Sequence, residues 1–209
     1  MIKLIKKMVK TDLQIYDNFL DDDSFRKLHK WMLVVEDGPT NEKAFNCKWV
    51  YTSSIDYPFA DPRNTSLENN FMFTHMFYAN HGFFLSEGID YISPIMDKIN
   101  PYAVYRIKAN MMVRSDKIIK NSFHIDHNLD DINLDQRKDF LKHFYTAIYY
   151  VNSNNGYTFF EDTDQIVQSK ANRLVVFPSI WQHNGTNCTD ENVRVLININ
   201  FVKRMNGPY

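Results

Sequence analysis

The spacing of hydrophobic and polar residues changes near residue 102. Beyond this point apolar residues recur at every second position in short segments, a pattern typical of half-buried β-strands. Polar turns separate the segments, which favours a sandwich or barrel of short strands. The strands are predicted at residues 104–113, 122–127, 144–151, 158–161, 173–177, 182–185 and 193–202.

The first half of the chain combines a strand with two helices. Residues 12–20 alternate loosely as a strand, and the aspartates at 21–23 then offer N-cap carboxylates for a helix through FRKLHKWMLV. A second helix is predicted over 86–98, where Pro94 either kinks it or marks a new start. Residues 71–85 are crowded with aromatic and methionine side chains, which indicates a buried helix or part of a substrate-facing lid.

Length and composition limit the domain organisation. With 209 residues, 44% of them hydrophobic, the chain is long enough for one buried core and short for two full domains. We therefore expect a single domain over 1–209. Its N-terminal helical support covers about 1–100, and its strand-rich core covers about 101–204.

Charge and targeting signals make several partners unexpected. The net charge of -1 and the pI of 6.6 indicate no basic surface for nucleic acid or an anionic membrane. The start MIKLIKKMVK has no long apolar run and no small-residue cleavage site, so it predicts neither a signal peptide nor a membrane span. We expect a cytoplasmic protein. Cys47 and Cys188 show no CxxC spacing and are predicted to be reduced thiols.

A candidate metal site begins in the segment SFHIDHN. His124 and Asp126 are two residues apart, so on a strand both side chains leave the same face. His183 follows an apolar strand and a proline in VVFPSIWQHNG, a place where side chains can face a cleft. Two neutral imidazoles and one carboxylate are suited to hold Fe(II) on one face of its octahedron. The opposite positions stay open for oxygen and a chelating co-substrate.

A candidate anion site follows eleven residues later at Arg194. The intervening NGTNCTDEN is rich in turn residues, so the chain can fold back antiparallel and bring Arg194 beside the metal. In VRVLININF one face is apolar throughout, and the other carries Arg194, Leu196, Asn198 and Asn200. A planar guanidinium on this inward face can bind the distal carboxylate of an iron-chelating dicarboxylate through two parallel hydrogen bonds.

The order and spacing of HID, AIYYVN, NGYTFF, RLVVFPSIWQH and VRVLININF resemble those of 2-oxoglutarate oxygenases, most closely the prolyl 4-hydroxylase branch. The resemblance is strong over the last half of the chain and weaker over the opening IYDNFL. It implies a mainly β fold with flanking helices, the double-stranded β-helix (jelly roll, cupin-like). It also implies Fe(II), 2-oxoglutarate and O2, with ascorbate as an additional candidate cofactor.

The resemblance also assigns residues to roles. His124, Asp126 and His183 match the iron ligands, and Arg194 matches the residue that pairs with the distal carboxylate of 2-oxoglutarate. Tyr150 matches a tyrosine that often shares this contact. Members of the family that halogenate replace the metal-binding carboxylate with a small residue, so the retained aspartate favours hydroxylation.

The chain departs from the family upstream of the HxD motif. Family members commonly carry a glycine-rich approach that contains a tyrosine, whereas this chain has NMMVRSDKIIKNSF. Asn110 or Arg114 are the candidates to complete the 2-oxoglutarate site instead. The departure puts specificity for proline in question.

The resemblance implies a dioxygenase that hydroxylates a peptidyl proline or another protein or small-molecule acceptor and decarboxylates 2-oxoglutarate to succinate. Two alternatives remain open. The first is a jelly-roll module that binds metal and ligand without turnover. The second is a zinc hydrolase that uses the same three ligands around a water. Trp181 and Asn200 are candidate substrate contacts, and LDDINLD (129–135) is interpreted as a solvated loop.

Overall fold

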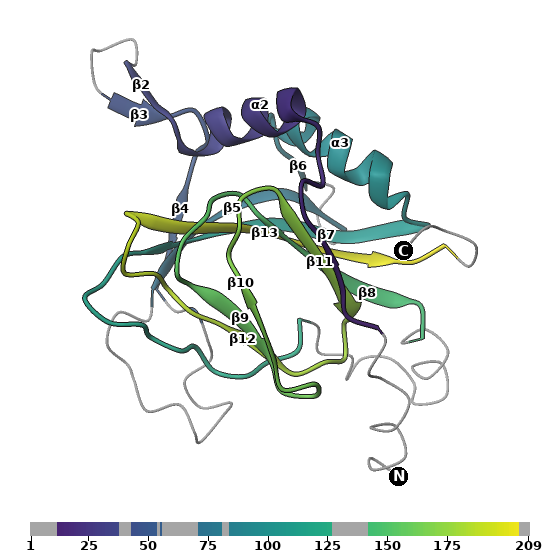
Figure 1. Ribbon diagram of the computed structural model, residues 1–209. Coiled ribbons are helices and arrows are strands. Elements are labelled where there is room, and N and C mark those ends of the chain that lie inside the picture. Colours follow the sequence, from purple (N-terminus) through teal and green to yellow (C-terminus); the bar gives the residue numbers. More distant parts are fainter. Residues whose placement is uncertain are drawn as a thin grey trace.

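Two antiparallel sheets of unequal size face each other, and two helices cover the outer face of the larger one (Figure 1). This computed structural model describes residues 12–37, 43–53, 55, 71–80, 84–126 and 142–204. The larger sheet contains, in spatial order, β1 (Gln14–Tyr16), β11 (Arg173–Pro178), β8 (Phe144–Tyr150), β13 (Val193–Val202), β7 (Ala103–Val113), β5 (Met72–Ala79) and β4 (Val50–Thr52), with β6 (Phe84–Leu85) paired to β5. The smaller sheet contains β10 (Gln165–Gln168), β9 (Tyr157–Phe160) and β12 (His183–Gly185).

The remaining elements are α2 (Asp22–Leu33), α3 (Ile89–Ile99) and a pair of short strands, β2 (Val35–Asp37) and β3 (Lys43–Phe45). The Asp21 side chain caps α2 by accepting hydrogen bonds from the backbone N–H groups of Asp23 and Ser24, as predicted. The second helix runs through Pro94 and ends at Ile99, and the left-handed backbone of the following Asn100 is a common helix terminator. None of the described helices is long and apolar enough to cross a membrane.

The hydrophobic core has two layers, and strand alternation assigns each residue to one of them. On β13, Val195, Ile197 and Ile199 pack in the layer under the helices. Leu196 points the other way, into the layer between the sheets. The predicted split of this strand into an apolar face and a mixed face is confirmed. This mainly β architecture with flanking helices is the predicted jelly roll.

Two predicted elements differ from the structure. Residues 71–85, interpreted as a buried helix or a lid, instead contain the strands β5 and β6. Both faces of β5 are at least partly covered, so its apolar run lacks strand alternation and resembles a buried helix. Residues 122–127 form no strand in the described part, which ends at Asp126, and His124 makes only an isolated bridge to His183. Strand β10 was not predicted, because Val167 is its one buried residue.

Candidate metal and co-substrate site

A cavity of about 270 Å³ opens between the two sheets. Its walls come from β7 and β13 of the large sheet, from β12 of the small sheet, and from the segment after β7. All three predicted metal ligands line this cavity, and so does Arg194. The fold therefore brings together residues that lie up to seventy positions apart in the sequence.

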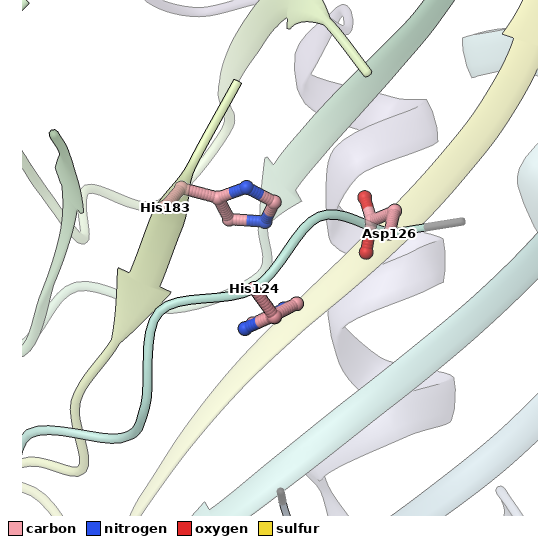
Figure 2. A group of neighbouring side chains, drawn as sticks. All are labelled: His124, Asp126 and His183. Carbon is pink, nitrogen blue, oxygen red and sulfur yellow. The ribbon is translucent and has the colours of Figure 1, made fainter. Parts of the chain in front are cut away.

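The three candidate ligands converge at one place. One donor atom each from His124, Asp126 and His183 lies within 4.8 Å of the other two. The backbones of the two histidines exchange hydrogen bonds of 3.0 and 3.1 Å, which sets their side chains next to each other with ring centroids 4.6 Å apart. Figure 2 shows His183 on β12 and the other two residues on the adjoining segment. The isolated β-bridge between His124 and His183 thus brings the three side chains together, where a strand over 122–127 was expected to do so.

Hydrogen bonds to the backbone orient both imidazole rings. The Nδ1 atom of His124 lies 3.1 Å from the carbonyl oxygen of Ser122, and that of His183 lies 3.0 Å from the carbonyl oxygen of Trp181. A carbonyl only accepts, so both Nδ1 atoms carry the proton. The Nε2 lone pairs are then free, which is the tautomer that binds metals.

The Asp126 carboxylate is 4% exposed and is held by three side chains. Its Oδ2 atom accepts hydrogen bonds from the Thr146 hydroxyl at 2.9 Å and from the Asn200 amide at 3.0 Å. Arg106 lies 3.6 Å from Oδ1. Burial opposes ionisation of this carboxyl group, but the two histidines, Arg106 and the hydroxyl hold the pKa of Asp126 well below its ordinary value.

The donor set fits a divalent transition metal. Two neutral imidazole nitrogens and one carboxylate oxygen are the ligands of non-heme Fe(II) oxygenases, and they leave positions open on the cavity side. The same three donors are also suited to a catalytic Zn²⁺. The choice between the two metals therefore depends on what else lines the cavity.

Arg194 is fully buried at the cavity wall. Its Nε atom donates to the Ser169 hydroxyl at 2.7 Å, and its two Nη atoms donate to the Thr186 carbonyl at 2.9 Å and the Thr158 hydroxyl at 3.2 Å. A guanidinium has five N–H groups, so two remain for a ligand. All three of these partners are neutral, and a buried cation with no counter-charge among the described residues favours binding of an anion.

Tyr150 lies behind Thr158 rather than on the cavity wall. Its hydroxyl donates to the Thr158 hydroxyl at 2.8 Å, and the guanidinium of Arg194 lies 5.7 Å from the centre of its ring. Thr158 itself lines the cavity, whereas Tyr150 is not among the lining residues. Tyr150 therefore does not border the cavity itself, but its hydroxyl is bonded to a residue that does.

The structure separates the other candidates. Asn110 lines the cavity, and its buried Oδ1 atom has no hydrogen-bond partner in the part of the chain that the structure describes. Arg114 borders a smaller adjoining space of about 80 Å³ instead. Trp181 is buried against Phe160 and is not among the cavity residues, and the amide of Asn200 binds Asp126. The segment 129–135 lies outside the described residues.

Sequence reasoning missed Thr146, Thr158 and Arg106. Each is a polar or charged residue on the same strand face as apolar residues of the inter-sheet layer or the cavity. An inward polar residue on an otherwise apolar strand face is the signal that could have found them. Their partners could not be found in this way, because they lie on other strands.

Acid is expected to destabilise the metal-free protein through His183. Burial, reinforced by the neighbouring His124, lowers the pKa of His183 to about 4, whereas an unfolded histidine titrates at about 6.5. Between these values protons bind the unfolded chain first, so the free energy of unfolding falls as the pH drops from about 6.5 to about 4. The full loss is on the order of 3 kcal/mol.

Urea denaturation of the metal-free protein at a series of pH values measures this loss, with His183→Gln for comparison. The glutamine variant keeps the polar side chain but cannot take up a proton, so its stability should fall less over the same interval. The lowered pKa of Asp126 adds a further loss at acid pH, and this loss should also be smaller in the glutamine variant because His183 contributes to that lowering. An identical pH dependence of the two proteins would remove His183 as the cause.

Solved structures with a similar fold are iron- and 2-oxoglutarate-dependent enzymes. An oxidoreductase of the 2OG-Fe(II) oxygenase family from Burkholderia pseudomallei superposes with a TM-score of 0.60 at 7% identity, over 93% of this chain and 87% of that one. A Trichoplax adhaerens prolyl hydroxylase, solved with a peptide of hypoxia inducible factor, gives 0.52 at 14% identity, over 96% and 90%. HygX from Streptomyces hygroscopicus, with nickel and 2-oxoglutarate bound, gives 0.52 at 9% identity, over 99% and 88%.

Sequence comparison adds nothing to this result. No protein-family model matches the chain, and no curated protein matches it. Identities between 7% and 14% show a shared fold and no more. The chain therefore has the fold of the 2-oxoglutarate- and Fe(II)-dependent oxygenases, prolyl hydroxylases among them, as the order of its motifs predicted.

Proposed function

We propose that this protein is an Fe(II)- and 2-oxoglutarate-dependent dioxygenase that hydroxylates a peptidyl proline or another acceptor. One observation carries the proposal: the three convergent metal donors and the buried cation Arg194 line one cavity. A zinc hydrolase needs the donors but has no evident use for the guanidinium. A dicarboxylate that chelates a metal at one end needs both.

Each residue has a distinct part in this function. His124, Asp126 and His183 would hold the iron, and Arg194 would bind the distal carboxylate of 2-oxoglutarate. Bound iron would supply the activation of O2, with one oxygen atom entering succinate and the other entering the hydroxylated acceptor. The chain's own contribution is to orient the co-substrate and to keep water from the cavity. Asn110 is our candidate for a further contact with 2-oxoglutarate, and ascorbate remains a candidate additional cofactor.

Thr158 is expected to donate a hydrogen bond to the co-substrate. Its oxygen already accepts from both Arg194 and Tyr150, so its own proton is free to point into the cavity. Thr158→Val keeps the shape and removes this donor, and should weaken 2-oxoglutarate binding roughly tenfold without loss of iron. Thr163→Val is the matched control, because the buried Thr163 hydroxyl has no hydrogen-bond partner. Equal affinities for 2-oxoglutarate in all three proteins would exclude the contact.

The proposal is tested by adding Fe(II) and then 2-oxoglutarate to the metal-free protein without oxygen. A metal-to-ligand charge-transfer band should appear in the visible spectrum only when both are present. His183→Ala should lose the band, whereas His29→Ala, on the outer helix α2, should keep it. A folded, iron-loaded protein without the band would contradict the proposal and favour the zinc hydrolase or the metal-binding module.

Turnover separates the enzyme from a binding module. With O2 admitted, the enzyme consumes 2-oxoglutarate and forms succinate, and a suitable acceptor raises the rate. A module that binds metal and co-substrate shows the band but forms no succinate. Succinate formation therefore distinguishes the enzyme from the binding module, which would share the same site.

A further inference from the structure

Lys108 faces the cavity, and no residue in the described part of the chain forms an ion pair with it. On the inward face of β7 it lies between Arg106, which contacts Asp126, and Asn110. Directly opposite on β13 is Asn198, which is 7% exposed and whose buried Oδ1 atom has no hydrogen-bond partner among the described residues. Among the residues that the structure describes, none pairs with the Lys108 ammonium within salt-bridge distance. Arg106 contacts Asp126 and Arg194 is assigned to 2-oxoglutarate. The Lys108 ammonium and the Asn198 amide therefore have no role in the proposed site so far.

The charges around the cavity do not cancel. Its described lining carries three cationic side chains, Arg106, Lys108 and Arg194, against the single carboxylate of Asp126. Fe(II) and the dianion of 2-oxoglutarate add no net charge when both bind. A positive excess therefore remains in a partly desolvated space, which favours a second ligand that places a carboxylate or another anionic group there.

The environment of Lys108 supports the same conclusion. Burial, with a smaller contribution from Arg106, lowers the pKa of the Lys108 amine to about 8, although Asp126 acts in the opposite direction. The ammonium is thus less stable than in water, and an anion placed beside it would restore its charged form. The Asn198 amide beside it can supply a further hydrogen bond.

The distal carboxylate of 2-oxoglutarate is not the anion in question. Asn198 is four residues from Arg194 along one strand, a separation of roughly 13 Å at about 3.3 Å per residue. The next cross-strand pair beyond Lys108 and Asn198 is Arg106 with Asn200, and both of these residues contact Asp126. The unused pair therefore lies toward the metal-binding end, where the reacting C–H bond of the acceptor has to be.

We infer that Lys108 and Asn198 form the acceptor subsite, and that the acceptor is a free amino acid whose carboxylate pairs with Lys108. The buried Oδ1 atom of Asn198 would accept a hydrogen bond from its N–H group. A cavity of about 270 Å³ has room for a small acceptor beside 2-oxoglutarate. The inference rests on the proposed function and narrows its acceptor, because a prolyl residue inside a peptide offers no carboxylate at this point.

The experiment presents the protein, loaded with Fe(II) and 2-oxoglutarate, with each free L-amino acid and with its C-terminal amide. Shifts of the charge-transfer band without oxygen and succinate formation with oxygen are recorded. At least one free acid should shift the band and raise succinate formation, and its amide should be roughly tenfold to a hundredfold weaker. Lys108→Met should abolish this preference, Lys108→Arg should keep part of it, and the exposed-site control Lys48→Met should keep all of it.

Four outcomes would overturn the inference and leave the proposed function standing. These are equal responses to acids and amides, an unchanged preference in Lys108→Met, no response to any amino acid, and stimulation only by a prolyl peptide blocked at both ends. Loss of the charge-transfer band itself in Lys108→Met would place the ammonium on 2-oxoglutarate and also overturn it. Absence of the band in the unmodified protein would instead overturn the proposed function, and this inference with it.

Discussion

Asp126→Ala is expected to abolish coupled turnover and to lower the affinity for Fe(II) by more than roughly a hundredfold. Loss of an outer hydrogen-bond partner of a ligand costs about tenfold to a hundredfold, and loss of the ligand itself should cost more. The carboxylate also accepts hydrogen bonds from Thr146 and Asn200, so its removal deprives two donors of a charged acceptor. Anaerobic Fe(II) titration and succinate formation measure the two losses.

Two further variants separate the loss of the ligand from damage to the fold. Asp126→Asn keeps the size of the side chain and loses its charge, so it should fold normally and still bind iron poorly. Asp23→Ala removes an exposed carboxylate from α2 and should change neither quantity. Tight iron binding with full turnover in Asp126→Ala would eliminate this residue as a ligand.

Arg194→Ala is expected to weaken 2-oxoglutarate binding by about a hundredfold or more while iron binding persists. Each hydrogen bond between charged groups contributes about 1.5 to 3 kcal/mol, and the guanidinium has two N–H groups left for a carboxylate. Arg194→Lys should lose less affinity for 2-oxoglutarate, because lysine keeps the positive charge and loses only the paired N–H donors of the guanidinium. Titration of 2-oxoglutarate into the iron-loaded protein, followed by the charge-transfer band, gives the affinities.

Arg194 is fully buried, so the alanine variant also loses packing, and its folding needs a separate check.

Gly156→Ala offers a test that retains the arginine. A Cβ atom there would lie 2.5 Å from Cδ of Arg194 and 2.5 Å from the backbone oxygen of Asn187, so both the arginine side chain and the local backbone have to shift. Affinity for 2-oxoglutarate should fall with little effect on iron. Arg26→Ala, which breaks an exposed ion pair with Asp23 on α2, is the control. Equal loss of iron and co-substrate in the Arg194 variants would argue for a structural role.

The local pattern of the chain determined much of this arrangement. The two-residue spacing of His124 and Asp126, and the position of His183 after an apolar strand, predicted three donors that the structure does bring together. Alternation along 193–202 put Arg194 on the inward face, where it lines the cavity. These features depend on neighbours within a few residues, because strand faces follow a period of two.

Only the tertiary structure decided which strands lie beside one another. Thr146 on β8 is the register partner of Asn200 on β13. Both side chains donate hydrogen bonds to Asp126, which lies in a loop distant from them in the sequence. Lys108 meets Asn198 in the same way across β7 and β13. Strand β5 was misread because both of its faces are covered, which removes the alternation that identifies a strand. The periodicity of one segment determines which face of the sheet each residue occupies. It does not determine which residue of another strand lies opposite, because that pairing depends on the packing of the whole sheet.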